Sequence, residues 1–534
     1  MVCGKMHAMK TRTEQSYNQR EKRIKLLDEK DLEHGLSVDE AKELIGLQRA
    51  HLGFLQEQFR LAKHKLFASK NEAYPGQGEL FNEAEDIAQQ SEAELADEEQ
   101  FTEYTAKRKK RNRKVVDDTV EREVVIHDID EADKTCDCCQ GQMHVMGKDV
   151  TEKLEYVPAT IKVIENHRLK YACRTCEKNG TKTPIKQAPP VPSILPKSYA
   201  TPSLIAQIIV SKFQYGLPLY RLETMLGHIG IHISRQTMSD WLIKISALFK
   251  PITYEPWHDI LLKQDYVRCD ETTMIVVGDD NVKSYMWVYN CGADSPAGNI
   301  NGDDTPNIVL YDYQPSRAGK CAVDFLRGYD GYLGVDGYAG YHLTLAQLVA
   351  CLAHIRRKFV EAKKMQGKNA KVGKADWALN QIQKLYRIEK QIKDKTIEER
   401  YRIRQEQSLP LLVQFKTWLD KSSLTVLPQS LLGKAINYAI NQWSKFVRYI
   451  EDGRIDIDNN RSERAIKPFV IGRKGWLMSQ TANGANASAV LYSLIETAKA
   501  CGIKPYDYLV HVMQKMMEGN VNPEEILPWK VNLG

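Results

Sequence analysis

Two aspartates lie in apolar, strand-like stretches of this sequence, where an uncompensated charge is costly. Asp270 lies in the stretch 266–277, which is rich in β-branched side chains, and Asp336 ends a second such stretch, 332–336, 66 residues after Asp270. A carboxylate buried in a strand destabilises a fold unless its charge is compensated, and a divalent cation is a common compensation. We therefore interpret the pair as part of a metal site, which a third acid, Glu463, would complete.

Length and composition limit the class of protein. The 534 residues are too many for one hydrophobic core and predict roughly three or four domains. The 75 Lys and Arg exceed the 69 Asp and Glu by only six, so the total charge indicates no particular partner. Because the sequence has no apolar run of about 18 residues and no signal-like N-terminus, we expect a cytoplasmic protein without a membrane partner. In that reducing compartment the 11 cysteines are expected to be free, buried or metal-bound.

The charged residues are unevenly distributed near the N-terminus. Residues 83–103 contain nine acids and no Lys or Arg, and residues 107–114 contain seven bases. This composition predicts a polar linker, whose basic end either contacts phosphates or is simply solvated. Upstream, apolar side chains at alternating spacings of three and four predict a helix within residues 39–70. The pattern is compatible with a coiled-coil dimer or with one amphipathic helix packed on its own chain.

Two pairs of cysteines have the spacing of zinc ligands. Cys136 and Cys139 form the first pair, and Cys173 and Cys176 form the second. Four thiolates close a tetrahedral structural Zn²⁺ site, which stabilises a small fold but leaves no position open for chemistry. Cys138 leaves the choice of ligand in the first pair open. The 33 residues between the pairs alternate enough to predict long hairpin strands over 150–163 and 167–172, and the other interpretation is reduced cysteines in a small sheet.

A helical domain is predicted after the proline-rich linker that ends near Pro196. The pattern predicts helices over 202–213, 218–226 and 234–248, with Gly230 supplying the positive φ of the turn between the second and third. Ser234 suits the N-cap of the third helix. This is the geometry of a helix-turn-helix, although a helical hairpin between domains has the same pattern. The side chains expected to contact base edges or phosphates are Arg235, Gln236 and Thr237.

The next segment changes to strands. Three strands are predicted over 266–277, 284–290 and 307–313, followed by a helix over 319–326 and a fourth strand over 331–335. Three antiparallel strands, a helix and a strand that ends in an acid follow the order of the ribonuclease-H-like fold. In that fold Asp270 and Asp336 become neighbours across the sheet. Strand alternation directs the adjacent Glu271 to the other face, so we do not expect it to be a ligand.

Five blocks of sequence surround the proposed acids: Cys269-Asp-Glu-Thr-Thr273, Val335-Asp-Gly-Tyr-Ala-Gly-Tyr341, Cys351-Leu-Ala-His-Ile-Arg-Arg-Lys-Phe359, Asp458-Asn-Asn-Arg-Ser-Glu-Arg464 and Gly472-Arg-Lys-Gly-Trp-Leu477. With these blocks the chain resembles the large transposase of bacterial insertion sequence 66 elements, and the likeness covers nearly the whole chain. It departs from the usual family pattern at Leu352, where Trp is usual, and at Gly475 and Met478, where Asn and Phe are usual.

The resemblance implies a DDE transposase with Asp270, Asp336 and Glu463 as its catalytic triad. The triad would bind two Mg²⁺ ions, or Mn²⁺, first to nick the element end and then to join the freed 3′ hydroxyl to target DNA. It also implies an all-helical insertion between the second and third acids. The 127 residues between them leave room for it, and the apolar residues of 356–449 have helical spacing. The expected partners are double-stranded DNA, further copies of the chain in the synapse, and small accessory proteins of the same element.

Several side chains near the acids have more than one interpretation. Without the resemblance, Glu463 is equally well an exposed acid on a helix that begins with a cap at Asn459 or Asn460. Other acids also compete for its role. Trp476 either stacks on an unpaired base or packs in the core. Cys351 and His354 resemble half of a zinc site, with no other half evident. The competing acids are Asp456, Asp458 and Glu496, and the bases expected to position DNA are Arg356, Arg357, Arg464, Lys467, Arg473 and Lys474.

Together these patterns predict a multidomain α/β protein with a ribonuclease-H-like core and an all-helical insertion. Two other functions fit part of the sequence: a ribonuclease-H-like nuclease without strand transfer, and a zinc and helix-turn-helix regulator that only binds DNA. The expected segments are a helical or coiled-coil region 1–80, a linker 81–125, a zinc-binding β domain 126–188, a helix-turn-helix domain 189–255, the core 256–355 and 451–500 with its insertion 356–450, and a C-terminal tail helix 501–534.

Overall fold

The fold is described from a computed structural model. The structure describes residues 23, 26–27, 30, 35–46, 48, 124, 161–174, 178–180, 185–281, 283–365, 373–519 and 521–533. The chain divides into two compact units, one formed by Met1–Glu94 with Pro192–Gly534 and the other by Leu95–Val191. No helix in these described ranges has both the length and the apolar character that crossing a membrane requires. Most of the predicted coiled-coil region lies outside the described residues, although residues 38–46 are helical.

The described two-stranded sheet, whose strands lie on either side of the second cysteine pair in the sequence, is shorter than predicted. Strand β1 (Lys170–Ala172) pairs with β2 (Ile185–Gln187) in antiparallel register, and both strands are exposed. Residues 170–172 form a strand as predicted, and it pairs with β2, which follows it. Of the predicted partner stretch, residues 161–163 form no strand, and the rest lies outside the described residues. Of the four predicted zinc ligands, only Cys173 lies within the described residues.

The helices predicted after the proline-rich linker are present. They are α5 (Pro202–Ile209), continued by the π-helix η3 (Val210–Gln214), then α6 (Leu219–His228) and α7 (Arg235–Phe249). Ser234 caps α7 by accepting a hydrogen bond from the backbone N–H of Thr237, at 3.1 Å. Gly230 has the predicted positive φ, at 84°. Met238, Trp241, Leu242 and Ile245 are buried and form the face of α7 that packs inward.

A five-stranded mixed sheet forms the centre of the larger unit. Its strands are β3 (Tyr266–Met274), β4 (Ser284–Cys291), β5 (Ile308–Gln314), β6 (Tyr332–Val335) and β7 (Gln347–Ala350). The order across the sheet is β5-β4-β3-β6-β7. Strands β3, β4 and β5 are antiparallel neighbours, while β3, β6 and β7 run parallel. Around them lie α8 (Tyr254–Leu261), η4 (Pro296–Gly298), α9 (Gly319–Phe325) and η5 (Ala339–Leu343).

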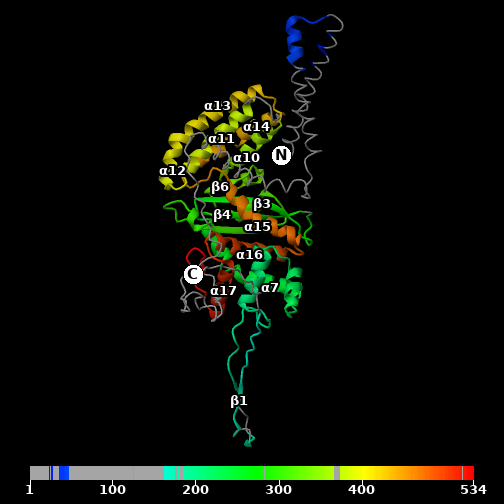
Figure 1. The fold of residues 1–534 in the computed structure, drawn as a ribbon, viewed down its shortest axis with the longest axis vertical. Coiled ribbons are helices and arrows are strands. Elements are labelled where there is room, and N and C mark those ends of the chain that lie inside the picture. The colour runs from blue at the N-terminus through cyan, green and yellow to red at the C-terminus, as the bar shows by residue number, and fades with distance from the viewer. Residues whose placement is uncertain are drawn as a thin grey trace, which may run out of the picture. The chain divides into compact units, whose positions relative to one another are not determined.

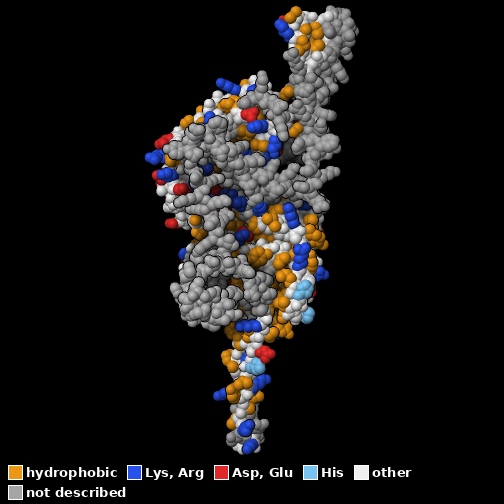
Figure 2. Space-filling model, viewed as in Figure 1, with side chains coloured by type: hydrophobic (Ala, Val, Ile, Leu, Met, Phe, Trp, Pro, Cys, Tyr) orange, Lys and Arg blue, Asp and Glu red, His pale blue; other side chains and the backbone are white. Residues whose placement is uncertain are grey.

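Beyond the β7 edge the chain is helical, as the spacing over 356–449 predicted (Figure 1). This region has its own hydrophobic cluster, which includes Phe359, Ile382, Phe415 and Ile436. Its outer surface carries both acidic and basic side chains (Figure 2). The elements are α10 (Leu352–Lys364), α11 (Lys374–Gln391), α12 (Ile397–Ile403), η6 (Arg404–Ser408), α13 (Leu409–Thr425), α14 (Leu431–Phe446) and η7 (Val447–Ile450). The chain then returns to the sheet through α15 (Asn460–Trp476).

The opposite edge of the sheet is covered by α16 (Ala482–Ala500), a helix that is buried along most of its length. An edge strand presents unpaired backbone groups, and α16 satisfies them with hydroxyls. Thr497 Oγ1 accepts a hydrogen bond from the N–H of Val309 at 3.0 Å and donates one to its carbonyl at 2.9 Å. Ser493 Oγ accepts from the N–H of Tyr311 at 2.8 Å. After α16, the chain ends with α17 (Pro505–Glu518) and η8 (Pro523–Ile526).

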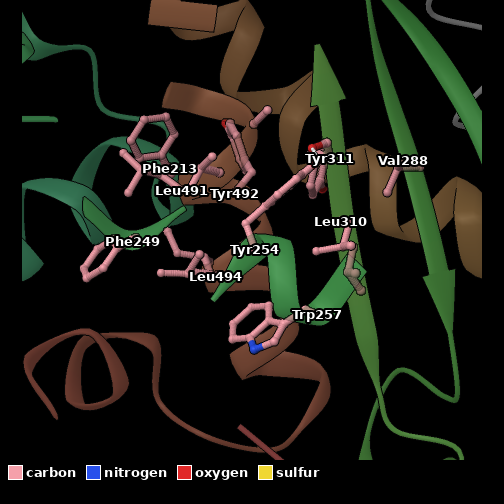
Figure 3. Close-up of a cluster of buried hydrophobic side chains, with 14 of the residues drawn as sticks. Phe213, Phe249, Tyr254, Trp257, Val288, Leu310, Tyr311, Leu491, Tyr492 and Leu494 are labelled. Carbon is pink, nitrogen blue, oxygen red and sulfur yellow. Dashed lines mark hydrogen bonds between the residues drawn. The ribbon is translucent and has the colours of Figure 1, made fainter. Parts of the chain in front are cut away.

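The main core lies where α16 meets the helices 202–261 and the edge strand β5. Phe213 and Tyr492 pack edge to face, with ring centroids 5.0 Å apart. The helices 202–249 are therefore attached to the sheet through α16. Figure 3 shows this cluster, in which the labelled side chains are Phe213, Phe249, Tyr254, Trp257, Val288, Leu310, Tyr311, Leu491, Tyr492 and Leu494.

Candidate active site

The two predicted aspartates lie on neighbouring strands at the same level of the sheet. Asp270 is in β3, and Asp336 follows the last residue of β6. The two strands are parallel with Arg268 opposite Gly334, and the same offset of 66 residues places Asp270 level with Asp336. A parallel pair directs side chains at one level to the same face. Gly337, which follows Asp336, is needed here, because a Cβ would meet the Tyr438 hydroxyl oxygen at 2.6 Å.

Glu463 joins the aspartates from the first turn of α15. It is buried, and its pKa is raised to about 7, first by loss of hydration and then by the charges of Asp458 and Asp336. The pKa of Asp270 is raised well above its ordinary value by loss of hydration and by the charges of Glu271, Asp336 and Glu463. The charges of the three predicted acids thus act on one another, although the group of possible ligand atoms that lies within 4.8 Å in the described residues is Cys351, His354 and Glu463 rather than the three acids. Their mutual repulsion is relieved by protons or by a bound cation.

Three neighbours of Glu463 fix the position of its helix. Asn459 donates from Nδ2 to the backbone carbonyl of Cys269 in β3, at 2.9 Å. Ser462 Oγ accepts from Asn290 Nδ2 in β4, at 2.8 Å. Arg461 is buried and donates to the carbonyl oxygens of Gly292 and Ala293, the latter at 2.6 Å. The block 458–464 is therefore bonded to two strands and one loop, which holds Glu463 over the sheet.

The predicted cap of this helix was wrong in its chemistry. Asn459 occupies the N-cap position, but its side chain makes no capping hydrogen bond. The amide bonds to β3 instead, and Asp458 Oδ1 accepts from the N–H of Asn460 at 3.2 Å. The bond from Nδ2 to β3 orients the amide so that Oδ1, the atom that would cap the helix, has no hydrogen-bond partner among the described residues.

Both carboxylate oxygens of Glu463 are buried and have no hydrogen-bond partner within the described part of the chain. A buried ionised carboxylate without a partner is unfavourable. The nearest nitrogen is that of His354, whose Nδ1 lies 3.9 Å from Oε1. Burial and the charge of Arg357 lower the pKa of His354 to about 4, so this ring is neutral near pH 7 and does not compensate the carboxylate charge.

Glu463 is the third possible ligand beside Cys351 and His354, and the sequence did not reveal it. One ligand atom from each of the three residues lies within 4.8 Å of the other two. Cys351 Sγ also accepts a hydrogen bond from the backbone N–H of Asn459, at 3.1 Å. The sequence offered the Cys-x-x-His spacing as a signal, but Glu463 follows His354 by 109 residues. Only the return of the chain through α15 brings the three together.

Glu271 points to the other face of β3, as strand alternation predicted. Its carboxylate accepts a hydrogen bond from the Tyr341 hydroxyl, to which Cys269 on the same face also donates, at 3.3 Å. Arg317 donates from Nε to Glu271 Oε1 at 2.7 Å, and its Nη2 lies 3.9 Å from Asp336 Oδ2. Arg317 therefore links Glu271, on the other face of β3, to Asp336. Nothing in the sequence marked this arginine.

The acids that competed with Glu463 are occupied elsewhere. Asp456 accepts from Arg268 Nε at 2.8 Å. Asp458 accepts from Asn460, and its pKa is raised to about 6 by burial. Glu496 lies on α16, where it accepts from Lys499 at 2.9 Å.

The bases predicted to contact DNA fall into two groups, those close to the acids and those further along α10 and α15. Arg357 lies near the acids, where its charge lowers the pKa of Glu463 against the effect of burial. Arg464, next to Glu463, is exposed and bonds to Asp294 at 2.7 Å. Along the rest of the two helices, Arg356, Lys467 and Arg473 are half-buried, and Lys474 is exposed.

The helix-turn-helix side chains lie apart from the acids in sequence and are open to solvent. Arg235 and Gln236 are exposed at the start of α7, and Thr237 is half-buried. Gln236 donates to Asp240 at 3.0 Å. Trp476 is half-buried, with its ring 5.5 Å from that of Phe469 and with the Lys212 ammonium 5.2 Å from its centroid. This contact with the core cluster favours the packing interpretation of Trp476.

Comparison with known proteins matches four segments of the chain to related family models. The model described as the transposase IS66 family matches residues 197–487. The zinc-finger binding domain of transposase IS66 matches 133–177, the IS66 C-terminal element matches 493–529, and a model described as transposase C of IS166 homeodomain matches 54–125.

Proteins of Sinorhizobium fredii are similar over most of their length. The uncharacterized protein y4jD is 33% identical over 415 residues, which cover 75% of this chain and 79% of the relative. The uncharacterized protein y4hP is 30% identical over 509 residues, which cover 92% of this chain and 86% of the relative.

Proposed function

Because the chain belongs to the IS66 transposase family, we propose that it is a DDE transposase that nicks the ends of its insertion element and joins them to target DNA. The observation that carries this proposal is the cluster of Asp270, Asp336 and Glu463. Two come from the adjacent parallel strands β3 and β6, and the third comes from a helix bonded to β3 and β4. A site that cuts and joins phosphodiesters needs such converging carboxylates.

The strand arrangement supports a ribonuclease-H-like core. The order β5-β4-β3-β6-β7, with three antiparallel strands followed by two parallel ones, is the arrangement expected of that fold. Its first acid belongs to the central strand β3, and its second follows the neighbouring strand β6. The helices from α10 to α14 correspond to the insertion expected between the second and third acids.

The chemistry of the donor set fits Mg²⁺ or Mn²⁺. Three carboxylates are ligands that such hard cations prefer, and the raised pKa values of Asp270 and Glu463 show charges in need of compensation. We propose that Asp270, Asp336 and Glu463 hold two such ions. When bound, the ions would activate the attacking oxygen and stabilise the leaving 3′ oxygen of the scissile phosphate.

The chain itself supplies position and charge for this chemistry. Asn459, Arg461 and Ser462 hold Glu463 over the sheet, so the third carboxylate is placed before DNA arrives. Arg357 adds positive charge near the acids, where a DNA phosphate must approach. The same centre would serve water in the nicking step and the element's 3′ hydroxyl in the joining step, since neither step needs a covalent bond to the protein.

The remaining parts of the chain would hold DNA and the assembly. Arg235, Gln236 and Thr237 would contact element ends through the helix-turn-helix. Thiolates of Cys136, Cys139, Cys173 and Cys176 would bind one structural Zn²⁺, a role that the matched zinc-finger domain supports. Work on both element ends would require more than one copy of the chain in the synapse. Small accessory proteins of the element would complete the machinery in a bacterial cytoplasm.

Strand transfer by purified protein tests the proposal. The protein is incubated with pre-nicked element ends, Mg²⁺ and a supercoiled plasmid, and joined products are counted on a gel. Asp336→Asn should lower joining by at least about 100-fold without loss of DNA binding. Asp259→Asn, which alters an exposed acid on α8, is the matched control and should join normally.

Two outcomes would favour the competing functions. Cleavage without any joined product would indicate a nuclease. DNA binding that is unaffected, together with no cleavage in wild type or variant even when the accessory proteins are added, would indicate a regulator.

A further inference from the structure

A polar cavity of about 400 Å³ lies between the sheet, the helical region and the loop that follows β4. Its volume is within the range of small-ligand sites. Four aspartates contribute to the lining, but cations outnumber them. The six cations are Arg268, Lys393, Arg400, Arg454, Arg461 and Arg464.

The aspartates of the lining are already engaged. Asp456 accepts from Arg268, and Asp294 pairs with both Arg461 and Arg464. Asp265 pairs with Arg454, while Asp303 accepts from the N–H of Thr305 at 3.1 Å. The excess positive charge is therefore not neutralised by the acids of the cavity itself.

Arg400 is a buried cation of this lining with a long ion pair. It is 7% exposed, the charge of Asp456 acts on it, and the acid with which it pairs, Glu389, is shared with Arg404. Arg404 takes both carboxylate oxygens of Glu389, at 2.9 and 2.7 Å, whereas Arg400 remains 3.7 Å away. Its Nε has no hydrogen-bond partner among the residues that the structure describes. A buried guanidinium with an unused donor indicates a missing anion.

The walls of the cavity are tied together. Asn301, in the loop after β4, donates to the carbonyl of Asp394 at 2.7 Å and forms a bridge with Thr396. The loop thus connects the sheet to the turn before α12, on which Arg400 lies. Since this contact does not depend on a ligand, the site is preformed.

The cavity is adjacent to the catalytic cluster. Arg268 precedes Asp270 by two residues in β3, so both side chains lie on one face of the strand. Arg461 and Arg464 lie in the same helical turn as Glu463. A DNA strand whose scissile phosphate lies at the acids would therefore place a neighbouring phosphate near these arginines.

We propose that the cavity around Arg268, Arg400 and Arg461 binds a phosphate of the DNA strand that occupies the catalytic centre. Guanidinium groups match phosphate oxygens with paired N–H donors, and partial burial of the arginines strengthens such bonds. The proposal rests on the proposed transposase function for the source of the phosphate. The anion site itself rests on the cavity and its arginines alone.

Two variants on α12 form a matched pair for the test. Arg400→Gln removes the buried cation of the cavity, and Arg402→Gln makes the same change at an exposed position of the same helix. Should Arg400→Gln not fold, Lys393→Gln, at an exposed rim lysine, takes its place. Inorganic phosphate is titrated into the metal-free full chain by calorimetry, against chloride at equal ionic strength. A single-stranded oligonucleotide is then titrated in the same way.

Weaker binding of both phosphate and oligonucleotide by Arg400→Gln, by about tenfold or more, with Arg402→Gln unchanged, would support the proposal. Equal phosphate binding by all variants would overturn it, as would phosphate binding no different from chloride binding, which indicates an adventitious ion only. Loss of inorganic phosphate binding with unchanged DNA affinity would show that the cavity takes a free phosphate, which refutes the DNA assignment. Failure of wild type to bind or join DNA, with phosphate binding intact, would count against the transposase function instead.

Discussion

Replacing Glu463 by Gln should stabilise the metal-free protein at alkaline pH while abolishing its activity. The carboxyl is buried, its oxygens have no hydrogen-bond partner in the described residues, and its pKa rises from 4.5 to about 7. At 1.36 kcal/mol per unit, this shift corresponds to about 3 kcal/mol of destabilisation when the group is ionised. Glutamine has nearly the same shape and no charge, so the variant avoids that cost.

The sign of the pH dependence follows from the direction of the shift. Because the folded pKa lies above the unfolded one, the folded state binds the proton more tightly. The free energy of unfolding of wild type therefore falls progressively as the pH rises from about 4.5 to 7, and the full loss is present above pH 7. The advantage of Glu463→Gln should be below about 1 kcal/mol at pH 5 and about 3 kcal/mol at pH 8.

Urea unfolding in EDTA, followed by tryptophan fluorescence at pH 5, 6, 7 and 8, measures this difference. Glu255→Gln, at an exposed acid of α8, is the control and should change stability by no more than a few tenths of a kcal/mol. Adding Mg²⁺ should stabilise wild type more than Glu463→Gln, since the ligand set is then incomplete. A variant that is equally stable or less stable at every pH would refute the claim that this carboxylate is uncompensated.

Three further predictions concern other parts of the chain. Cys176→Ser should reduce bound zinc from one ion per chain to less than about one tenth by mass spectrometry of the metal, whereas the spare Cys138→Ser should retain it. Thr497→Val should leave the backbone groups of Val309 without partners and cost about 1–3 kcal/mol in urea unfolding, more than Ser488→Ala, whose hydroxyl bonds within its own helix. Arg235→Ala should weaken binding to element ends by about 10-fold and relax base preference at one position, which a fluorescence titration against mutated ends would detect; equal affinity for all sequences would contradict base contact.

Much of the fold followed from local patterns. The strands of 266–313, the helix of 319–325 and the three helices before the sheet lie close to their predicted bounds, because alternation and helical spacing report directly which face is buried. The exception was the small sheet, where β1 pairs with β2, a strand that the pattern did not predict. Its strands are exposed, so no buried face specified their partner.

Only part of the candidate site could be predicted from local sequence patterns. Asp270 and Asp336 were conspicuous because an acid in an apolar strand is costly, and both lie as predicted on adjacent parallel strands. Glu463 could not be separated from Asp456, Asp458 and Glu496 by sequence pattern. What distinguishes them in the structure is pairing, since the other three have hydrogen-bond partners and Glu463 has none among the described residues.

The sequence by itself determined the elements and the two strand-borne aspartates, because these depend on side chains a few residues apart. Tertiary structure decided which distant groups meet. It brought His354 to Glu463, Arg317 to Asp336, and Arg400 to the cavity beside β3. Such contacts depend on how helices and strands pack around a common core, and local spacing carries no record of a partner that is a hundred residues away.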